Sequence, residues 1–317
     1  MEVLLTGASG FVGSLLLRPL LEQGHSVTAL TREPQRLRAA LADAGDAGPR
    51  ILGGDAVTGA GLRDALEGIE LAYYLIHSME TMPGGPGFVE RERIAAGNFA
   101  TAATEAGVRR IVYLGGLVPR WTGGGKPPHA SRHLASRHAV EELLMEAVPD
   151  SLSLRASIVI GAGSRSFRLL VRLVERMPVI ALPGWQRFRT QPIDERDVVA
   201  MLLACATSEI SGEVLEIGGP DILTYGEILG RIAELMLIGR PTLRIGFNLT
   251  PLAGRVAAAI ATEDPQLVVP LMEGLQGDLL AREDNAAERL GVHLHRFDAA
   301  VEHALAEWER REPLAAR

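Results

Sequence analysis

The chain has 317 residues, 47% of them hydrophobic and 22% charged, so it can bury a large core as two domains or as one large α/β unit with an appendage. The net charge of −7 gives no support for nucleic acid or an anionic membrane as the main partner, and the single cysteine, Cys205, excludes an internal disulfide and a cysteine zinc site. Because the sequence shows no signal peptide and no run of about 18 uncharged apolar residues, we expect a cytoplasmic protein without a membrane span.

Short apolar segments along the chain predict strands, and helical patterns separate the early ones. The expected strands are 3–5, 26–30, 50–52, 71–76, 111–114, 152–160 and 214–217, and the expected early helices are 11–23, 35–44, 61–67, 88–106 and 133–147. Most strand segments are continuously apolar, as in a parallel sheet buried on both faces, and the alternation is typical of βαβ units. We therefore predict an α/β fold. Residues 1–160, completed by 191–218, would form a Rossmann doubly wound parallel sheet of about seven strands that binds NAD(P), and residues 161–190 and 219–317 a smaller, mainly helical substrate-binding portion.

The first predicted strand runs directly into three glycines spaced three apart, and an apolar helical pattern follows. Gly7 allows a tight reversal, Gly10 lets the backbone approach a diphosphate, and Gly13 lets the helix pack on its strand. The N–H groups at the start of such a helix point at the bound anion. We therefore expect this turn to bind the cofactor through Gly7, Ser9, Gly10, Phe11, Val12 and Gly13.

The end of the second predicted strand carries the residues that select the cofactor. In dinucleotide-binding folds an acidic residue there binds the ribose of NAD, whereas an arginine accommodates the 2′-phosphate of NADP. Thr31 stands at the usual acidic position and Arg32 follows it, so we predict NADP(H) in preference to NAD(H). Glu33 would repel the phosphate if it turned inward, and the alternative for Arg32 is a plain surface residue near a helix start.

Further motifs occur in order along nearly the whole chain, at residues 6–13 (a match to TGxxGxxG), 54–55, 154–163, 191–198 and 216–220. Through them the sequence resembles the short-chain dehydrogenase/reductase superfamily in its extended and atypical branches. Residues 73–79 and 113–117 are similar to NmrA-like proteins and to the NADPH-binding subunit of respiratory complex I. The resemblance implies that Asp55 contacts adenine and that Ala56, Ile76, His77 and Gly115 border the cofactor, His77 through its backbone or, alternatively, in proton transfer.

Members of that superfamily carry a catalytic serine after the fifth strand and a Tyr-x-x-x-Lys motif on the next helix. Both are missing from this sequence. The serine position falls at Gly115 or Gly116, His133 and Arg137 stand where tyrosine and lysine would be, and the only lysine is Lys126. Either His133 supplies a proton with Arg137 easing its release, or the substrate carries its own electron sink. Arg137 would also anchor the nicotinamide ribose. The alternative for His133 and Arg137 is an exposed pair one helical turn apart.

The leading hypothesis is an NADPH-dependent reductase that acts on a small activated or conjugated carbonyl, quinone or imine compound. We expect no metal site, and the sequence does not decide between a monomer and a homo-oligomer. The alternatives are a non-catalytic NADPH-binding sensor, regulator or assembly protein, and an epimerase or lyase of nucleotide sugars. Segments 82–87, 119–128 and 247–259 are expected to cap the pocket. A stripe of four arginines on one helix is expected to be a solvated face or, alternatively, to meet an anionic substrate: Arg165, Arg168, Arg172 and Arg176.

Overall fold

The computed structural model describes residues 1–42, 48–77, 87–118, 132–177, 179–182, 184–239, 241–244, 277–282, 285–310 and 312. For residues 132, 133, 180–182, 184 and 242–244 it describes the backbone alone. The segments that the sequence predicts to cap the pocket therefore lie almost wholly outside the described residues.

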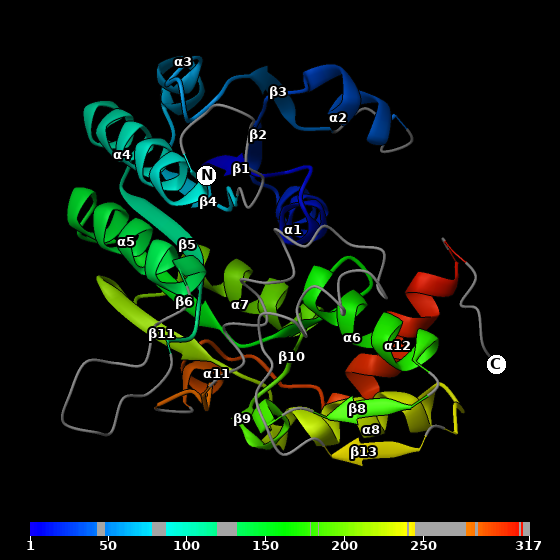
Figure 1. The fold of residues 1–317 in the computed structure, drawn as a ribbon. Coiled ribbons are helices and arrows are strands. Elements are labelled where there is room, and N and C mark those ends of the chain that lie inside the picture. Colours follow the sequence, from blue (N-terminus) through cyan, green and yellow to red (C-terminus); the bar gives the residue numbers. More distant parts are fainter. Residues whose placement is uncertain are drawn as a thin grey trace.

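Seven parallel strands form one sheet at the centre of the molecule (Figure 1). They are β1 (Glu2–Thr6), β2 (Ser26–Thr31), β3 (Arg50–Gly53), β4 (Leu71–Tyr74), β5 (Arg110–Gly116), β6 (Leu152–Ala156) and β11 (Glu213–Ile217). Their order is β11-β6-β5-β4-β1-β2-β3. The chain moves outward from β1 to β3 on one side and from β4 to β11 on the other, so the order reverses between β1 and β4, where ligands of such sheets bind. The predicted doubly wound fold is confirmed.

Alternate residues of the strands face two different helical layers. Val3 and Leu5 of β1 share a core with residues of α1 (Phe11–Glu22) and α7 (Glu195–Thr207). Leu4 shares the opposite core with α3 (Leu62–Leu66), α4 (Phe88–Ala106) and α5 (Arg132–Ala147), and the short α2 (Pro34–Ala40) packs beside β3. Because both faces of β1 are covered, its sequence is apolar throughout instead of alternating.

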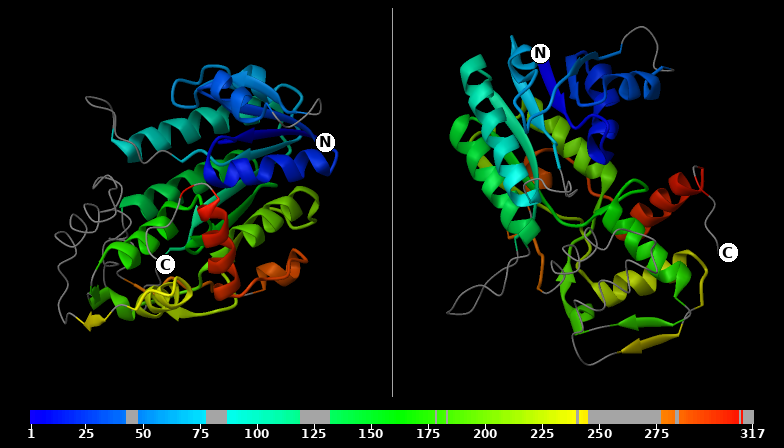
Figure 2. Two further views of the ribbon diagram at one scale, coloured as in Figure 1. Left: turned by 90° about the vertical axis from the view of Figure 1, so that its right-hand side faces the viewer. Right: turned by 45° about the horizontal axis from the view of Figure 1, so that its top comes forward.

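A second group of elements forms a smaller body beside the sheet (Figure 2). It contains β7 (Val159–Ile160), α6 (Arg165–Arg176), β8 (Ile180–Leu182), η1 (Gly184–Arg187), β9 (Arg189–Thr190), β10 (Ile193–Asp194), β12 (Leu223–Thr224), α8 (Tyr225–Leu235), β13 (Thr242–Arg244) and α12 (Phe297–Glu309). The short α11 (Ala286–Arg289) packs instead on β11 of the main sheet. Much of the smaller body packs around a core of its own that includes Phe167, Trp185, Tyr225, Phe297 and Trp308. The proposed domain boundaries stay a prediction.

The single strand predicted at residues 152–160 is divided in the structure. β6 ends at Ala156, and β7 pairs with β10 outside the main sheet. Between them, the Ser157 hydroxyl lies 2.7 Å from the hydroxyl of Thr190. Within this one apolar run the chain therefore leaves the main sheet and pairs with β10. The hydrophobic pattern alone does not show this change of partner strand.

The arginine stripe of α6 is not a uniformly solvated face. The guanidinium carbons of Arg168 and Arg172 lie 4.3 and 4.9 Å from the ring centroid of Trp308 on α12. Both arginines also form ion pairs with Glu312, at 3.2 Å for Arg168. These two side chains thus fasten the C-terminal helix to α6. The expected solvated face is wrong for Arg172, whose side chain is 9% exposed, and contact with an anionic substrate stays a prediction.

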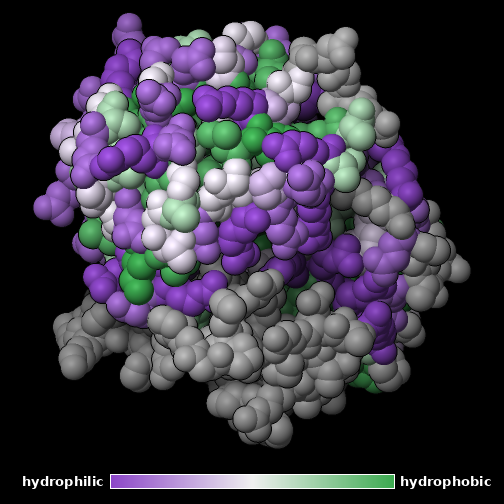
Figure 3. Space-filling model, turned by 90° about the horizontal axis from the view of Figure 1, so that it is seen from above, coloured by the Kyte–Doolittle hydropathy of each residue, from purple (hydrophilic) through white to green (hydrophobic). Residues whose placement is uncertain are grey.

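Among the described helices, none combines the length and the apolar composition needed to cross a bilayer. Seen from above (Figure 3), polar side chains cover most of the described surface, and apolar side chains show between them in smaller groups.

Candidate active site

The turn between β1 and α1 has the geometry of an anion-binding loop. Gly7 has a φ of +71°, and a Cβ on Gly13 would lie 2.2 Å from the Gly7 carbonyl oxygen, so a side chain there would push α1 away from β1. A Cβ on Gly10 would meet only that oxygen, at 3.1 Å, which leaves its outer side open. Among the described residues no side chain caps α1, so its first N–H groups can receive a diphosphate.

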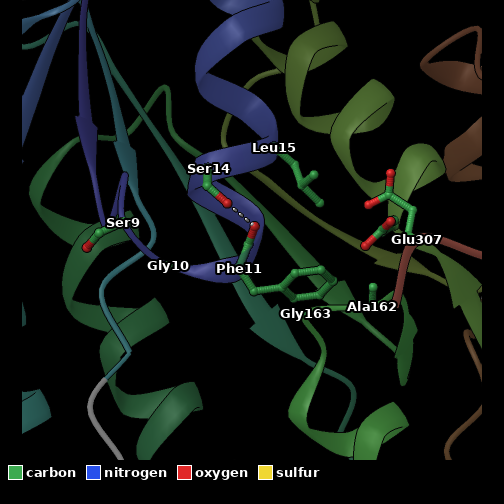
Figure 4. A pocket seen from close by; sticks show the side chains of 9 residues that line it. Ser9, Gly10, Phe11, Ser14, Leu15, Ala162, Gly163 and Glu307 are labelled. Carbon is green, nitrogen blue, oxygen red and sulfur yellow. Dashed lines mark hydrogen bonds between the residues drawn. The ribbon is translucent and has the colours of Figure 1, made fainter. Parts of the chain in front are cut away.

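A pocket of about 170 Å³ opens beside this turn (Figure 4). It is lined by Ser9, Gly10, Phe11, Ser14, Leu15, Ala162, Gly163, Glu195 and Glu307. The Phe11 ring lies against Gly163, where a Cβ would come within 2.6 Å of the ring. Val12 instead packs against the core between the sheet and α1. The structure thus places Ser9, Gly10 and Phe11 at the pocket. The Val12 side chain packs in the core, in addition to the cofactor contact expected of its backbone.

The residues at the end of β2 are arranged so that a cation is exposed and the neighbouring anion is neutralised. Arg32 is exposed and has no ion-pair partner among the described residues. Glu33 forms an ion pair with Arg36 at 3.1 Å, and its backbone N–H donates to Thr31 Oγ1 at 3.2 Å. The Glu33 carboxylate is therefore paired with Arg36 along α2, so it does not turn inward to repel a 2′-phosphate.

Asp55 follows β3 and organises the loop there. Its Oδ1 accepts a hydrogen bond from the backbone N–H of Val57 at 2.8 Å. Asn98 of α4 donates to the carbonyl oxygens of Ala56 and Val57, each at 2.9 Å, and so holds the same loop from the other side. Ala56 is buried. The loop beside the expected adenine position is thus fixed by hydrogen bonds from two elements.

Arg137 is buried at the carboxyl ends of β4 and β5, with 8% of its side chain exposed. Its Nη1 lies 2.8 Å from His77 Nδ1 and 3.2 Å from Glu92 Oε1, and its Nη2 donates to the Leu114 carbonyl oxygen at 2.9 Å. The guanidinium carbon lies 5.1 Å from the ring centroid of Tyr113. The alternative of an exposed helix-surface residue is therefore wrong for Arg137.

Glu92 of α4 is the residue of this cluster that the sequence reasoning missed. Its side chain is 4% exposed, and its Oε2 accepts from the Ser136 hydroxyl at 2.6 Å. Burial raises the pKa of this carboxyl, but the adjacent His77 ring, the Arg137 guanidinium and the Ser136 hydroxyl lower it by more, to about 2. One signal was available: Glu92 stands in line with Ala96, Phe99 and Ala103 on the buried stripe of α4.

His77 lies just beyond β4, at the switch point of the sheet, and 39% of its side chain is exposed. Its Nδ1 lies 3.0 Å from Glu92 Oε1. Burial and the Arg137 charge lower the pKa of His77 by more than Glu92 raises it. The neighbouring Ile76 offers its carbonyl oxygen at 3.4 Å from Arg137 Nη1, and Gly115, half-buried at the end of β5, completes this edge of the sheet.

All four tyrosines of the chain are buried in its cores. Tyr73, Tyr74, Tyr113 and Tyr225 are each at most 1% exposed, and burial raises the pKa of all four above the ordinary range. The hydroxyl of Tyr113 donates to the Arg137 carbonyl oxygen at 3.1 Å. No tyrosine is therefore available to protonate a substrate at the carboxyl edge of the sheet.

The backbone of α5 places His133 one helical turn before Arg137, but its side chain lies outside what the structure describes, as does Lys126. The role proposed for His133 therefore stays a prediction. Within the described ranges, no three side chains of His, Cys, Asp or Glu gather as metal ligands do.

Residues 7–150 match the family model described as NAD(P)H-binding. This stretch of the chain is therefore an NAD(P)H-binding domain. The glycine turn and the carboxyl ends of β4 and β5 lie within this matched region, which supports NAD(P)H binding at this edge of the sheet.

Three curated proteins are similar over most of this chain. The subunit named NADH dehydrogenase (ubiquinone) 1 alpha subcomplex subunit 9 of Arabidopsis thaliana is 26% identical over 73% of this chain, which spans only 56% of the length of that protein. Sterol demethylase protein B of Methylococcus capsulatus is 29% identical, with 77% of each chain covered. Ceramide reductase of Caulobacter vibrioides is 28% identical, with 74% of this chain and 70% of that protein covered.

Solved structures resemble the whole fold at low sequence identity. The UDP-glucose 4-epimerase of Thermotoga maritima has a TM-score of 0.72 at 15% identity, with 98% of this chain and 99% of that chain covered. At this identity the likeness concerns the fold alone.

Proposed function

We propose that the protein is an NADPH-dependent reductase of small apolar compounds that carry their own electron sink, such as a quinone, a conjugated carbonyl or an imine. The observation that carries the proposal is the burial of all four tyrosines in a chain that binds NAD(P)H. An ordinary ketone needs an acid to protonate the alkoxide left by hydride transfer. A substrate that delocalises the new charge needs positioning instead, and water completes the protonation.

The preference for NADPH is supported by the geometry at the end of β2. Arg32 is exposed, and Glu33 is neutralised by Arg36 at 3.1 Å, so an added 2′-phosphate would meet a net positive charge. A charge-assisted contact to that phosphate is worth about 1.5–3 kcal/mol, or about 10- to 150-fold in affinity.

The residues at the carboxyl edge of the sheet have distinct proposed tasks. Bound NADPH would supply the hydride. The amides at Gly10 and Phe11 would bind its diphosphate, Asp55 its adenine, and Arg137 its nicotinamide ribose. The Glu92 carboxylate, 3.2 Å from Arg137 Nη1, balances the arginine charge, so that Arg137 orients the ribose without leaving an uncompensated cation in the core.

The names of two relatives support an apolar substrate. One is a ceramide reductase and another a sterol demethylase protein, each similar to more than 70% of this chain. We extend to this chain only the general character of such substrates, namely a largely apolar body around the reacting group.

The test is NADPH oxidation against a panel of quinones, enones, imines and aldehydes. We expect turnover with at least one electron-sink compound, a loss of about 100-fold or more in kcat/KM for Arg137→Met, and little change for His133→Ala. The matched control is Arg63→Met, which alters an exposed arginine on α3 with 88% of its side chain accessible. A loss in His133→Ala as large as in Arg137→Met would make His133 the proton donor.

The second candidate is a non-catalytic NADPH-binding subunit or sensor. It is favoured by the similarity to the plant protein named as an NADH dehydrogenase subunit. Tight NADPH binding without oxidation by any compound of the panel would favour this candidate and contradict the reductase.

A further inference from the structure

Phe11, the first residue of α1, takes part in two different places through its backbone and its side chain. Its N–H is one of the donors at the uncapped start of the helix, where the diphosphate of the cofactor would bind. Its ring is half-buried and lines the pocket of about 170 Å³ beside the turn. Within the described part of the chain the ring belongs to none of the three hydrophobic cores, whereas the neighbouring Val12 packs against one of them. The ring therefore has a packing partner outside these cores.

That partner is the loop at residues 161–164, which joins β7 to α6. A Cβ on Gly161 would lie 2.7 Å from Phe11 Cζ, and a Cβ on Gly163 would lie 2.6 Å from Phe11 Cδ2. The three atoms nearest to such a Cβ on Gly163 all belong to the Phe11 ring, which lies directly beside this glycine in Figure 4. A side chain at either position would push the ring away, so the two glycines form its seat.

Between the two glycines the same loop is anchored in the smaller body. Ala162 is 3% exposed and lies in the core of that body, together with Phe167 of α6. The Ser164 N–H donates to the Gly161 carbonyl oxygen at 3.0 Å, and the Ser164 hydroxyl oxygen accepts from the Phe167 N–H at 3.4 Å, which caps α6. A displacement of the loop would therefore disturb the start of α6.

We propose that Phe11 is a positioning residue that couples dinucleotide binding at the glycine turn to the packing of the smaller body. Bound diphosphate holds the Phe11 amide and so fixes where α1 presents the ring. The ring in turn holds the 161–164 loop and the start of α6. Because one residue is held from both sides, each event favours the other, and the coupling is reciprocal.

The coupling has a consequence for the two portions of the molecule. The smaller body is the portion that the sequence predicts to bind the substrate, so a bound cofactor would also order the substrate side. Couplings of this kind change affinity by about 5- to 150-fold. The proposal rests on the NADPH binding proposed above and is independent of turnover.

The first test is a double-mutant cycle on NADPH affinity, measured by calorimetry. Phe11→Ala removes the ring and Gly163→Ala pushes it out of its seat, so each should weaken NADPH binding about 10-fold. The double variant has no ring for the new Cβ to meet, so we expect about the same 10-fold loss and not the roughly 100-fold loss of additive effects.

Two further variants serve as controls for this cycle. Phe11→Met keeps a long apolar side chain against the loop and should bind NADPH more tightly than Phe11→Ala. Gly230→Ala adds a Cβ to α8 of the smaller body, where it meets nothing within 4 Å, and should leave NADPH affinity unchanged.

Hydrogen exchange separates this coupling from a merely local effect on the turn. With saturating NADPH, we expect slower amide exchange both at the end of β2 and in α6. In Phe11→Ala, equally saturated, the slowing should remain at the end of β2 and be lost in α6.

Three results would overturn the proposal: additive losses in the cycle, an exchange rate of α6 in the unmodified protein that NADPH does not change, or full slowing of α6 in Phe11→Ala. These measurements follow binding and not chemistry. A protein that binds NADPH but reduces nothing therefore contradicts the reductase alone, whereas normal turnover with additive losses contradicts the coupling alone.

Discussion

Replacing Glu92 by glutamine should destabilise the protein because it leaves the buried Arg137 cation without its carboxylate. At 3.2 Å and an effective dielectric constant of 20, the attraction between the two charges is about 5 kcal/mol. A pKa of about 2 for Glu92, against the ordinary 4.5, corresponds to about 3 kcal/mol for its contacts with His77, Arg137 and Ser136 together. We therefore expect Glu92→Gln to lower the free energy of unfolding by about 3 kcal/mol, in the range for breaking a buried pair. For 317 residues this lowers Tm by about 5 °C.

The assay is denaturant and thermal unfolding of both proteins at neutral and acidic pH. The folded-state pKa of Glu92 lies below the unfolded value, so its stabilisation is complete above about pH 4.5 and is lost as pH falls toward 2. The stability difference between the two proteins should therefore narrow below pH 4.5. The control Glu90→Gln, on the exposed side of the same helix, should leave Tm unchanged, because its ion pair with Arg93 is solvated.

A double-mutant cycle decides whether the pair itself is responsible. Arg137→Met alone leaves a buried carboxylate, and the double variant with Glu92→Gln leaves neither charge. We expect the double variant to lose less than the sum of the single variants, with a coupling of at least about 1 kcal/mol. Equal stability of Glu92→Gln and the unmodified protein, or additive losses in the cycle, would refute the reasoning.

Three further predictions follow from the structure. Arg32→Ala should weaken NADPH binding about 10- to 150-fold and leave NADH binding nearly unchanged in calorimetry, and an equal loss for both cofactors would contradict the assignment. Gly13→Ala should abolish dinucleotide binding because its Cβ would lie 2.2 Å from the Gly7 carbonyl oxygen, whereas the control Gly97→Ala on α4 meets nothing within 4 Å and should not reduce stability. Arg110→Met should lower the free energy of unfolding by about 3 kcal/mol, since this buried side chain donates to four backbone carbonyls, and an unchanged denaturation midpoint would refute its clamping role.

The seven strands of the sheet and the glycine turn could be predicted from the sequence because they depend on neighbours close along the chain. A continuous apolar run such as Val3, Leu4 and Leu5 requires burial on both faces, and three glycines after it restrict the turn to a small set of backbone geometries. Likewise, the absence of Tyr-x-x-x-Lys is a property of the residue order alone. The fold and the cofactor class could therefore be predicted from the residue order alone.

Only the tertiary structure brought Glu92 to Arg137, 45 residues away, and His77 to both of them. The same holds for Arg172, which the pattern of α6 assigns to solvent and which the structure places against Trp308. In each case a charged side chain is buried because its counter-charge or aromatic partner arrives from a distant helix. Hydrophobic periodicity reports whether a position faces the core, but the partner that makes a buried charge tolerable is set by how helices pack across the sheet.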